Sequence, residues 1–214
     1  KTLSKCLEFD RLLSDFSARF VNIPLDQADR NIEHALKRIY EFFGSDLCAL
    51  LEVLPDNTMW KITHVAAIHD LPAVPGGTEF RSSICPWSFK KVIQKREPFS
   101  FSRLDDLPPE AGVDKQTFLE WGIRSMLEVP IFIGDSIDRV IVVNSVRKEC
   151  IWEEELVPKL QTLGEIFVNA LMRKQSELQI GEKMDVTNLQ LAELQFKRSQ
   201  TLLDALINST PDMI

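Results

Sequence analysis

Residues 125–146, SMLEVPIFIGDSIDRVIVVNSV, are the part of the chain that decides the fold. Two apolar runs, 125–133 and 139–146, flank the turn residues Gly134, Asp135 and Ser136. Runs rich in Val and Ile on either side of a short Gly-Asp turn are typical of two antiparallel strands. The stretch therefore predicts a β-hairpin, and with it a sheet.

A second hairpin is expected earlier in the chain. Residues 47–54 form a nearly continuous apolar run, residues 59–68 are rich in Trp, Ile, Thr and Val, and Pro55-Asp56-Asn57 lies between them. Apolar residues at helical spacing predict helices over 3–20 and 26–43. Gly44 follows the second helix at the position of a left-handed C-cap.

Shorter elements lie between the hairpins. Pro86 opens a predicted short helix that runs to about residue 95, and residues 114–121 predict another. A brief strand is expected over 98–101. The two remaining stretches predict loops, and these are residues 70–82, with their prolines and glycines, and residues 105–109. Hairpins rather than repeated strand–helix units indicate an α+β fold, with an antiparallel sheet of five to six strands flanked by helices.

Residues 152–208 contain no cluster of turn residues and predict a long C-terminal helix. Residues 151–173 carry an apolar stripe that should pack on the sheet. Farther along, spacings of three and four favour a coiled-coil seam in a homodimer, formed by Leu189, Ala192, Phe196, Ser199, Leu203 and Leu206. The alternative is a helix that lies on its own domain. Gly181, with acidic residues on the projected seam, predicts a weak joint over 174–186.

Composition excludes several classes of protein. The net charge of -7 argues against sequence-independent binding of nucleic acid, which needs a basic face. No apolar run approaches the ~18 residues of a membrane span, and no signal peptide is recognisable, so a cytoplasmic location without membrane contact is expected. The four cysteines show no CxxC spacing, which indicates reduced thiols rather than a zinc site. The start at Lys1 and the end at Ile214 indicate a fragment of a longer protein.

A family resemblance adds to these expectations. The segments that carry it are 122–131, 134–135, 140–146, 152–155 and 164–171, together with 86–87 and 101–108. They resemble a GAF domain of bacterial signalling proteins, over roughly residues 5–173. Residues 202–214 resemble the opening of a PAS domain. The order is similar to that in sensor histidine kinases of two-component systems and in diguanylate cyclases. It implies a GAF domain over 1–173, a signalling helix over 174–208 and a truncated PAS domain over 209–214.

The resemblance implies a small-ligand site between the sheet and the segment that covers it. The candidate ligand-binding residues are Trp60, His64, Arg81, Ser83, Cys85, Trp87 and Phe99. Their aromatic members are equally typical of a packed core. The ligand stays unknown. Residues 114–118 lack the Asp-Glu pair of cyclic-nucleotide GAF domains, and Cys85 is followed by Pro86 rather than by the His or Leu usual in bilin attachment.

Three functional hypotheses follow. In the first, the chain is a non-catalytic sensory module that binds a small ligand or partner and signals through a dimeric helix. In the second, it is a ligand-free dimerisation module. In the third, it is a thiol-based reductase that uses Cys48 and Cys85, which requires the two thiols to meet. His34 and the other two histidines are not at metal-ligand spacing, so no haem or other metal is expected.

Overall fold

The computed structural model describes residues 2–54, 58–71, 75–134 and 136–209, and for 2, 138, 181–182, 185–189, 192, 198–199 and 201–209 it describes the backbone alone. The chain divides into two compact units, Lys1–Leu171 and Met172–Ile214.

The first unit is built on a six-stranded sheet in the order β3-β2-β1-β6-β5-β4, in which every neighbouring pair is antiparallel. The strands are β1 Leu47–Val53, β2 Met59–Ala67, β3 Glu79–Arg81, β4 Phe99–Phe101, β5 Ser125–Ile133 and β6 Ser136–Ser145. β1 pairs with β2 and β5 with β6, which confirms both predicted hairpins. The two hairpins meet in the centre, where Leu47 of β1 pairs with Asn144 of β6. The predicted antiparallel α+β fold is therefore confirmed.

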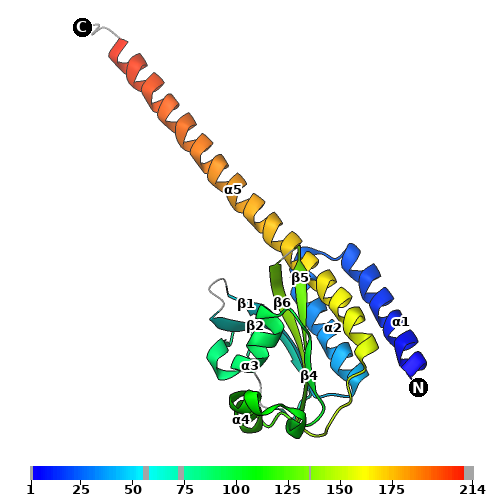
Figure 1. The fold of residues 1–214 in the computed structure, drawn as a ribbon. Coiled ribbons are helices and arrows are strands. Elements are labelled where there is room, and N and C mark those ends of the chain that lie inside the picture. Colours follow the sequence, from blue (N-terminus) through cyan, green and yellow to red (C-terminus); the bar gives the residue numbers. More distant parts are fainter. Residues whose placement is uncertain (1, 55–57, 72–74, 135, 210–214) are drawn as a thin grey trace. The chain divides into compact units, whose positions relative to one another are not determined.

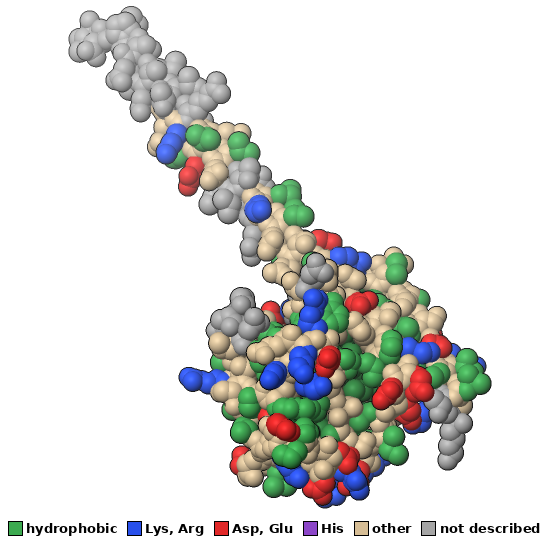
Figure 2. All heavy atoms as spheres, in the orientation of Figure 1, with side chains coloured by type: hydrophobic (Ala, Val, Ile, Leu, Met, Phe, Trp, Pro, Cys, Tyr) green, Lys and Arg blue, Asp and Glu red, His purple; other side chains and the backbone are tan. Residues whose placement is uncertain are grey.

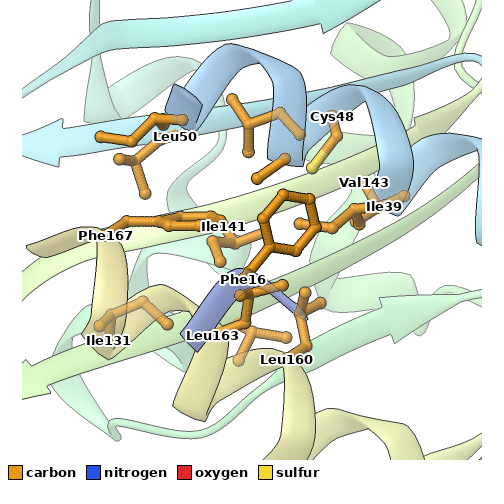
Figure 3. Close-up of a cluster of buried hydrophobic side chains, with 14 of the residues drawn as sticks. Phe16, Ile39, Cys48, Leu50, Ile131, Ile141, Val143, Leu160, Leu163 and Phe167 are labelled. Carbon is orange, nitrogen blue, oxygen red and sulfur yellow. The ribbon is translucent and has the colours of Figure 1, made fainter. Parts of the chain in front are cut away.

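Long helices cover one face of this sheet (Figure 1). They are α1 Thr2–Val21, α2 Ala28–Phe43 and the first part of α5 Val157–Ser209. Their apolar stripes meet inward-pointing strand residues in a cluster that we call the first core. Figure 3 shows Phe16, Leu160 and Phe167 from the helices beside Ile131 and Ile141 from the strands. Gly44 ends α2 with a φ of 62°, as its position predicted.

Shorter elements cover the other face. They are α3 Pro86–Phe89, the π-helix Lys90–Gln94 that continues it, and α4 Gly112–Glu120. Their apolar side chains pack on the alternate residues of the same strands, such as Ala49 and Val142. We call this cluster the second core. Its rings include Phe101 and Phe118, whose centroids lie 5.3 Å apart.

Two predictions about irregular segments were wrong. Residues 70–82 were expected to lack regular structure, yet β3 lies within them and pairs with Met59–Lys61 of β2. A three-residue edge strand is held by backbone hydrogen bonds, and its three side chains are too few to show a repeated alternation of apolar and polar residues. In the second predicted loop, short 3-10 turns form at Leu104–Asp106 and Pro109–Ala111. The long helix begins at Val157 rather than at residue 152, and Pro158 lies in its first turn, where proline is tolerated.

The second unit is helical from Met172 to Ser209, without a break over residues 174–186. Several of its described apolar side chains are exposed (Figure 2), among them Ile180, Met184 and Leu194. Of the predicted seam, only the side chain of Phe196 is described, and it is 64% exposed. The side chains of Leu189, Ala192, Ser199, Leu203 and Leu206 lie outside the described part, as do residues 210–214. The seam, the joint and the PAS segment stay predictions.

Candidate ligand-binding site

The second core contains a buried carboxylate, that of Glu128. Side chains alternate along a strand, so Leu127 and Val129 of β5 enter the first core while Glu128 points to the other face. Phe99 of β4 and Val142 of β6 are its cross-strand neighbours. Only 6% of Glu128 is exposed.

Ser88 of α3 joins Glu128 to a second carboxylate, that of Asp114. Ser88 Oγ donates a hydrogen bond to Glu128 Oε2 at 2.5 Å, and Ser88 N donates to Asp114 Oδ1 at 2.7 Å. Asp114 Oδ2 also accepts a bond of 3.0 Å from the backbone N–H of Trp87. Cys85, the residue before α3, makes no side-chain capping bond, so Asp114 supplies the N-terminal cap from α4.

Burial changes the pKa values of Glu128 and Asp114. Desolvation raises the pKa of Glu128 to about 7, and the nearby charge of Asp114 adds to the rise, while the bond from Ser88 opposes it. Desolvation also raises the pKa of Asp114, against its bonds to the two backbone N–H groups. Glu128 therefore changes protonation near neutral pH, which allows it to accept or donate a hydrogen bond there.

Four of the sequence-predicted candidates lie in or beside the second core. Cys85 and Phe99 are buried in it, and Trp87 is half-buried with its ring 5.1 Å from that of Phe99. Trp60 is 2% exposed and packs edge-on to the ring of Phe89 at 5.7 Å. Among the described residues, the buried Trp60 Nε1 has no hydrogen-bond partner. A polar ligand atom would satisfy that donor.

The other three candidates lie elsewhere. Arg81 and Ser83 are exposed. His64 lies four residues after Trp60 on β2, a spacing that would put both on one face of a regular strand. Thr63 is an extra, unpaired residue between them, and this β-bulge turns His64 to the α2 face. There its Nε2 lies 3.3 Å from Asp29 Oδ1. Burial lowers the pKa of His64, and Asp29 opposes that effect.

The sequence interpretation missed Glu128, Asp114 and Ser88. A signal for Glu128 was present, because it is the only charged residue in the apolar run 125–133. Asp114 and Ser88 had no comparable signal, because their contact joins residues far apart in the chain.

The cysteines do not form a thiol pair. Cys48 belongs to the first core and Cys85 to the second, so the sheet separates them. Burial raises the pKa of both thiols, which disfavours the reactive thiolate. Within the described residues, no group of three His, Cys, Asp or Glu side chains has a metal-binding arrangement. No helix in that part of the chain is both long and apolar enough to cross a membrane.

Comparison with known proteins identifies the fold. No family model and no curated protein sequence matches the chain. Solved structures do match. A phycocyanobilin-bound GAF domain from a cyanobacterial phytochrome is similar with a TM-score of 0.63 and 15% identity, over 80% of this chain and 96% of that one.

Two further solved structures agree. The chromophore-binding domain of an unusual bacteriophytochrome from R. palustris gives a TM-score of 0.64 and 11% identity, over 79% of this chain and 63% of that one. The GAF domain region of a putative membrane protein from Geobacter sulfurreducens gives a TM-score of 0.55 and 13% identity, over 68% of this chain and 93% of that one. The chain has the GAF fold.

Proposed function

We propose that the first unit is a non-catalytic sensory domain that binds a small ligand between the sheet and the α3–α4 layer. The observation that carries the proposal is Glu128, a buried carboxylate with a pKa of about 7 and a hydrogen bond to Ser88. Burying a carboxylate costs several kcal/mol unless it is well paired. Such groups gather at functional sites. The GAF domains of the phytochrome structures hold phycocyanobilin or phycoerythrobilin, which supports ligand binding by this fold.

The site favours a ligand that carries a hydrogen-bond donor, such as an amine or amide, for Glu128. It also favours an acceptor for the orphan Trp60 N–H. Both groups lie among aromatic rings, so the rest of the ligand is expected to be apolar. Covalent attachment through Cys85 is not proposed, because burial raises the pKa of its thiol and the nearby charges of Glu128 and Asp114 raise it further.

Strand β5 offers a route from the ligand to α5. Glu128 faces the α3–α4 layer, while Ile131 on the same strand faces Gly164 of α5. A Cβ atom added to Gly164 would lie 2.3 Å from Ile131 Cδ1, so the helix and the strand are in close contact. A ligand that binds one position of β5 more tightly than another would therefore shift α5 between two states.

We further propose that α5 passes this shift to a second copy and to a following domain. The seam from Leu189 to Leu206 would hold two helices together, and a PAS domain with a histidine kinase or diguanylate cyclase output would follow. Cysteines introduced at Leu189 and at Leu203, in a variant with Cys6→Ser, test the seam by disulfide crosslinking of the full-length protein. Crosslinks at both sites are expected, and their absence would reject a parallel seam.

Ligand binding is tested by a thermal-shift screen of amines, amides and aromatic metabolites, with native mass spectrometry of the purified protein. A hit should lose its shift in Glu128→Gln and keep it in Glu79→Gln, a matched change on the exposed edge strand. Equal loss in both variants would reject the site.

A ligand-free dimerisation module is the second candidate. It is favoured by the close packing of the Phe99, Phe101 and Phe118 rings, whose centroids lie 5.3–6.5 Å apart, as in an ordinary core. If the screen finds no ligand while cysteines introduced at Leu189 and Leu203 still form crosslinks, the dimerisation module is supported and the ligand-binding sensor is not.

A further inference from the structure

The contact between α3 and β5 depends on one serine and two carboxyl groups. Ser88 of α3 donates from its Oγ to Glu128 Oε2 and from its backbone N to Asp114 Oδ1. All three residues are buried, with exposed fractions of 1% for Ser88, 6% for Glu128 and 0% for Asp114. Among the described residues, no other hydrogen bond reaches the Glu128 carboxyl group. Carboxyl groups from β5 and from α4 therefore meet at a single residue of α3.

The surroundings of Glu128 do not compensate a negative charge. Its cross-strand neighbours, Phe99 of β4 and Val142 of β6, are apolar. Cys85, just before α3, has a thiol whose pKa is raised by burial, so it is uncharged at neutral pH. The charged group that acts on the pKa of Glu128 is Asp114, and it raises that pKa. A deprotonated Glu128 would therefore place two like charges close together in an apolar layer, which is unfavourable.

The lysines of the neighbouring helices do not supply a counter-charge. On the π-helix that continues α3 and on α4, the described lysines are exposed or pair with exposed carboxylates, and these are Lys90, the Lys91–Glu97 pair and the Lys115–Asp105 pair. None of them contributes to the pKa of Glu128. The neutral form of Glu128 is thus the form that suits a closed contact between α3 and β5.

α3 is held less firmly than β5. It has only four residues, it follows the 3-10 turn Ser82–Ile84, and its first N–H groups depend on Asp114 for a cap. β5 pairs with β4 on one side and β6 on the other, and its alternate residues pack in the first core. A short helix without a cap of its own depends on tertiary contacts. When the contact weakens, α3 is therefore the element that moves.

We propose that Glu128 is a proton-dependent switch, in which α3 stays closed on β5 while Glu128 is protonated and opens locally when the proton leaves to solvent. Opening lets water solvate the charged carboxylate. The closed form holds the proton to a pKa of about 7, against an ordinary value of 4.5. Between these values the closed form binds more protons, so the free energy of opening falls as pH rises, and the fall is complete above the higher pKa. The switch requires no bound ligand, so it stands or falls separately from the ligand-binding proposal.

Amide hydrogen exchange of the full chain at pH 5 and pH 8 tests the switch. The reporters are the N–H groups of Trp87 and Ser88, which donate to Asp114 in the closed form. After correction for the intrinsic exchange rate at each pH, their protection should be at least about tenfold lower at pH 8. Protection that does not fall would overturn the proposal.

A matched pair of variants assigns the fall in protection to Glu128. Glu128→Gln keeps an acceptor for Ser88 but carries no charge at either pH, so most of the fall should disappear. Glu110→Gln makes the same change at an exposed residue and should keep the whole fall. Circular dichroism melting checks that both variants fold. A full fall in Glu128→Gln would assign the pH dependence to another group and reject the switch.

Comparison with an amide of the first core separates local opening from unfolding, and it uses the parent protein alone. The reference is the N–H of Phe167, in the part of α5 that covers the first core. At pH 8, Trp87 and Ser88 should be at least about tenfold less protected than Phe167, and low urea should leave their exchange unchanged. Equal protection that falls with urea at all three amides would mean that α3 opens only when the domain unfolds, which contradicts the switch.

Discussion

The two faces of the sheet bury different kinds of side chain. The first core is built around Phe167, Leu160 and Ile141, all apolar and fully buried. The second core buries Glu128 and Asp114 among aromatic rings. One strand, β5, contributes to both, so the difference comes from alternate residues of the same segment. Apolar packing dominates the first face, where His64 is also buried, whereas the second face keeps a costly carboxylate. The first core is therefore interpreted as the scaffold, and the second core contains the candidate ligand-binding site.

The largest expected effect is on the first core. Phe167→Ala should lower the free energy of unfolding by about 3–5 kcal/mol, because a fully buried ring leaves a cavity. Urea unfolding measures the loss. Leu119→Ala, which truncates an exposed side chain, should stay within about 0.5 kcal/mol of the parent. Equal losses would mean that the first core is not the main source of stability.

Glu128→Gln tests the second core through pH. The folded protein holds the Glu128 proton to a pKa of about 7, but the unfolded chain releases it near the ordinary value of 4.5. Between these values the folded state binds more protons, so the free energy of unfolding falls as pH rises. The loss contributed by Glu128 is up to about 3 kcal/mol and is complete above the folded pKa. Glu128→Gln should remove this slope.

Urea unfolding at pH 5 and pH 8 measures that slope. The variant should gain stability over the parent mainly at pH 8. Parallel pH profiles for the two proteins would contradict the buried, uncharged state of Glu128.

Gly164→Ala tests the close contact between α5 and β5. The added Cβ would lie 2.3 Å from Ile131 Cδ1, so we expect a loss of about 1–3 kcal/mol despite the better helix propensity of alanine. Ile131→Val removes Cδ1 and should recover part of that loss in the double variant. Gly112→Ala is the control, because nothing lies within 4 Å of its added Cβ. Additive losses at 164 and 131 would argue against the contact.

The smallest expected effect is that of Asp114→Asn. The amide keeps one acceptor for the N-terminus of α3, so the loss should be below about 1 kcal/mol. The pKa of Glu128 should fall in this variant, because the charge of Asp114 helps to raise it. Carbon-13 NMR titration of the Glu128 carboxyl group measures the change. An unaltered pKa would show that the two carboxylates do not interact.

Local patterns predicted most of the fold. The two hairpins and Gly44 as a helix cap depend on neighbouring residues, which a sequence displays directly. β3 was not predicted, because the backbone groups of this short edge strand make its pairing with β2. The joint and the dimer seam remain predictions.

The candidate site was less predictable. Aromatic content pointed to Trp60, Trp87 and Phe99, but one extra residue at Thr63 moved His64 to the other face of the sheet. The Ser88–Asp114 contact depends on how α3 and α4 pack, a tertiary effect with no local signature.

The central pairing of β1 with β6 also affects how the chain is made. Leu47 and Asn144 are neighbours in the sheet but roughly 100 residues apart, a length that a ribosome adds in about 5–20 s. During that interval β1 has β2 as a partner on one side and an open edge on the other, beside an apolar surface that α5 does not yet cover. Sheets closed by such distant strands also fold slowly. The nascent domain is therefore expected to depend on chaperones until β6 and α5 have left the ribosome.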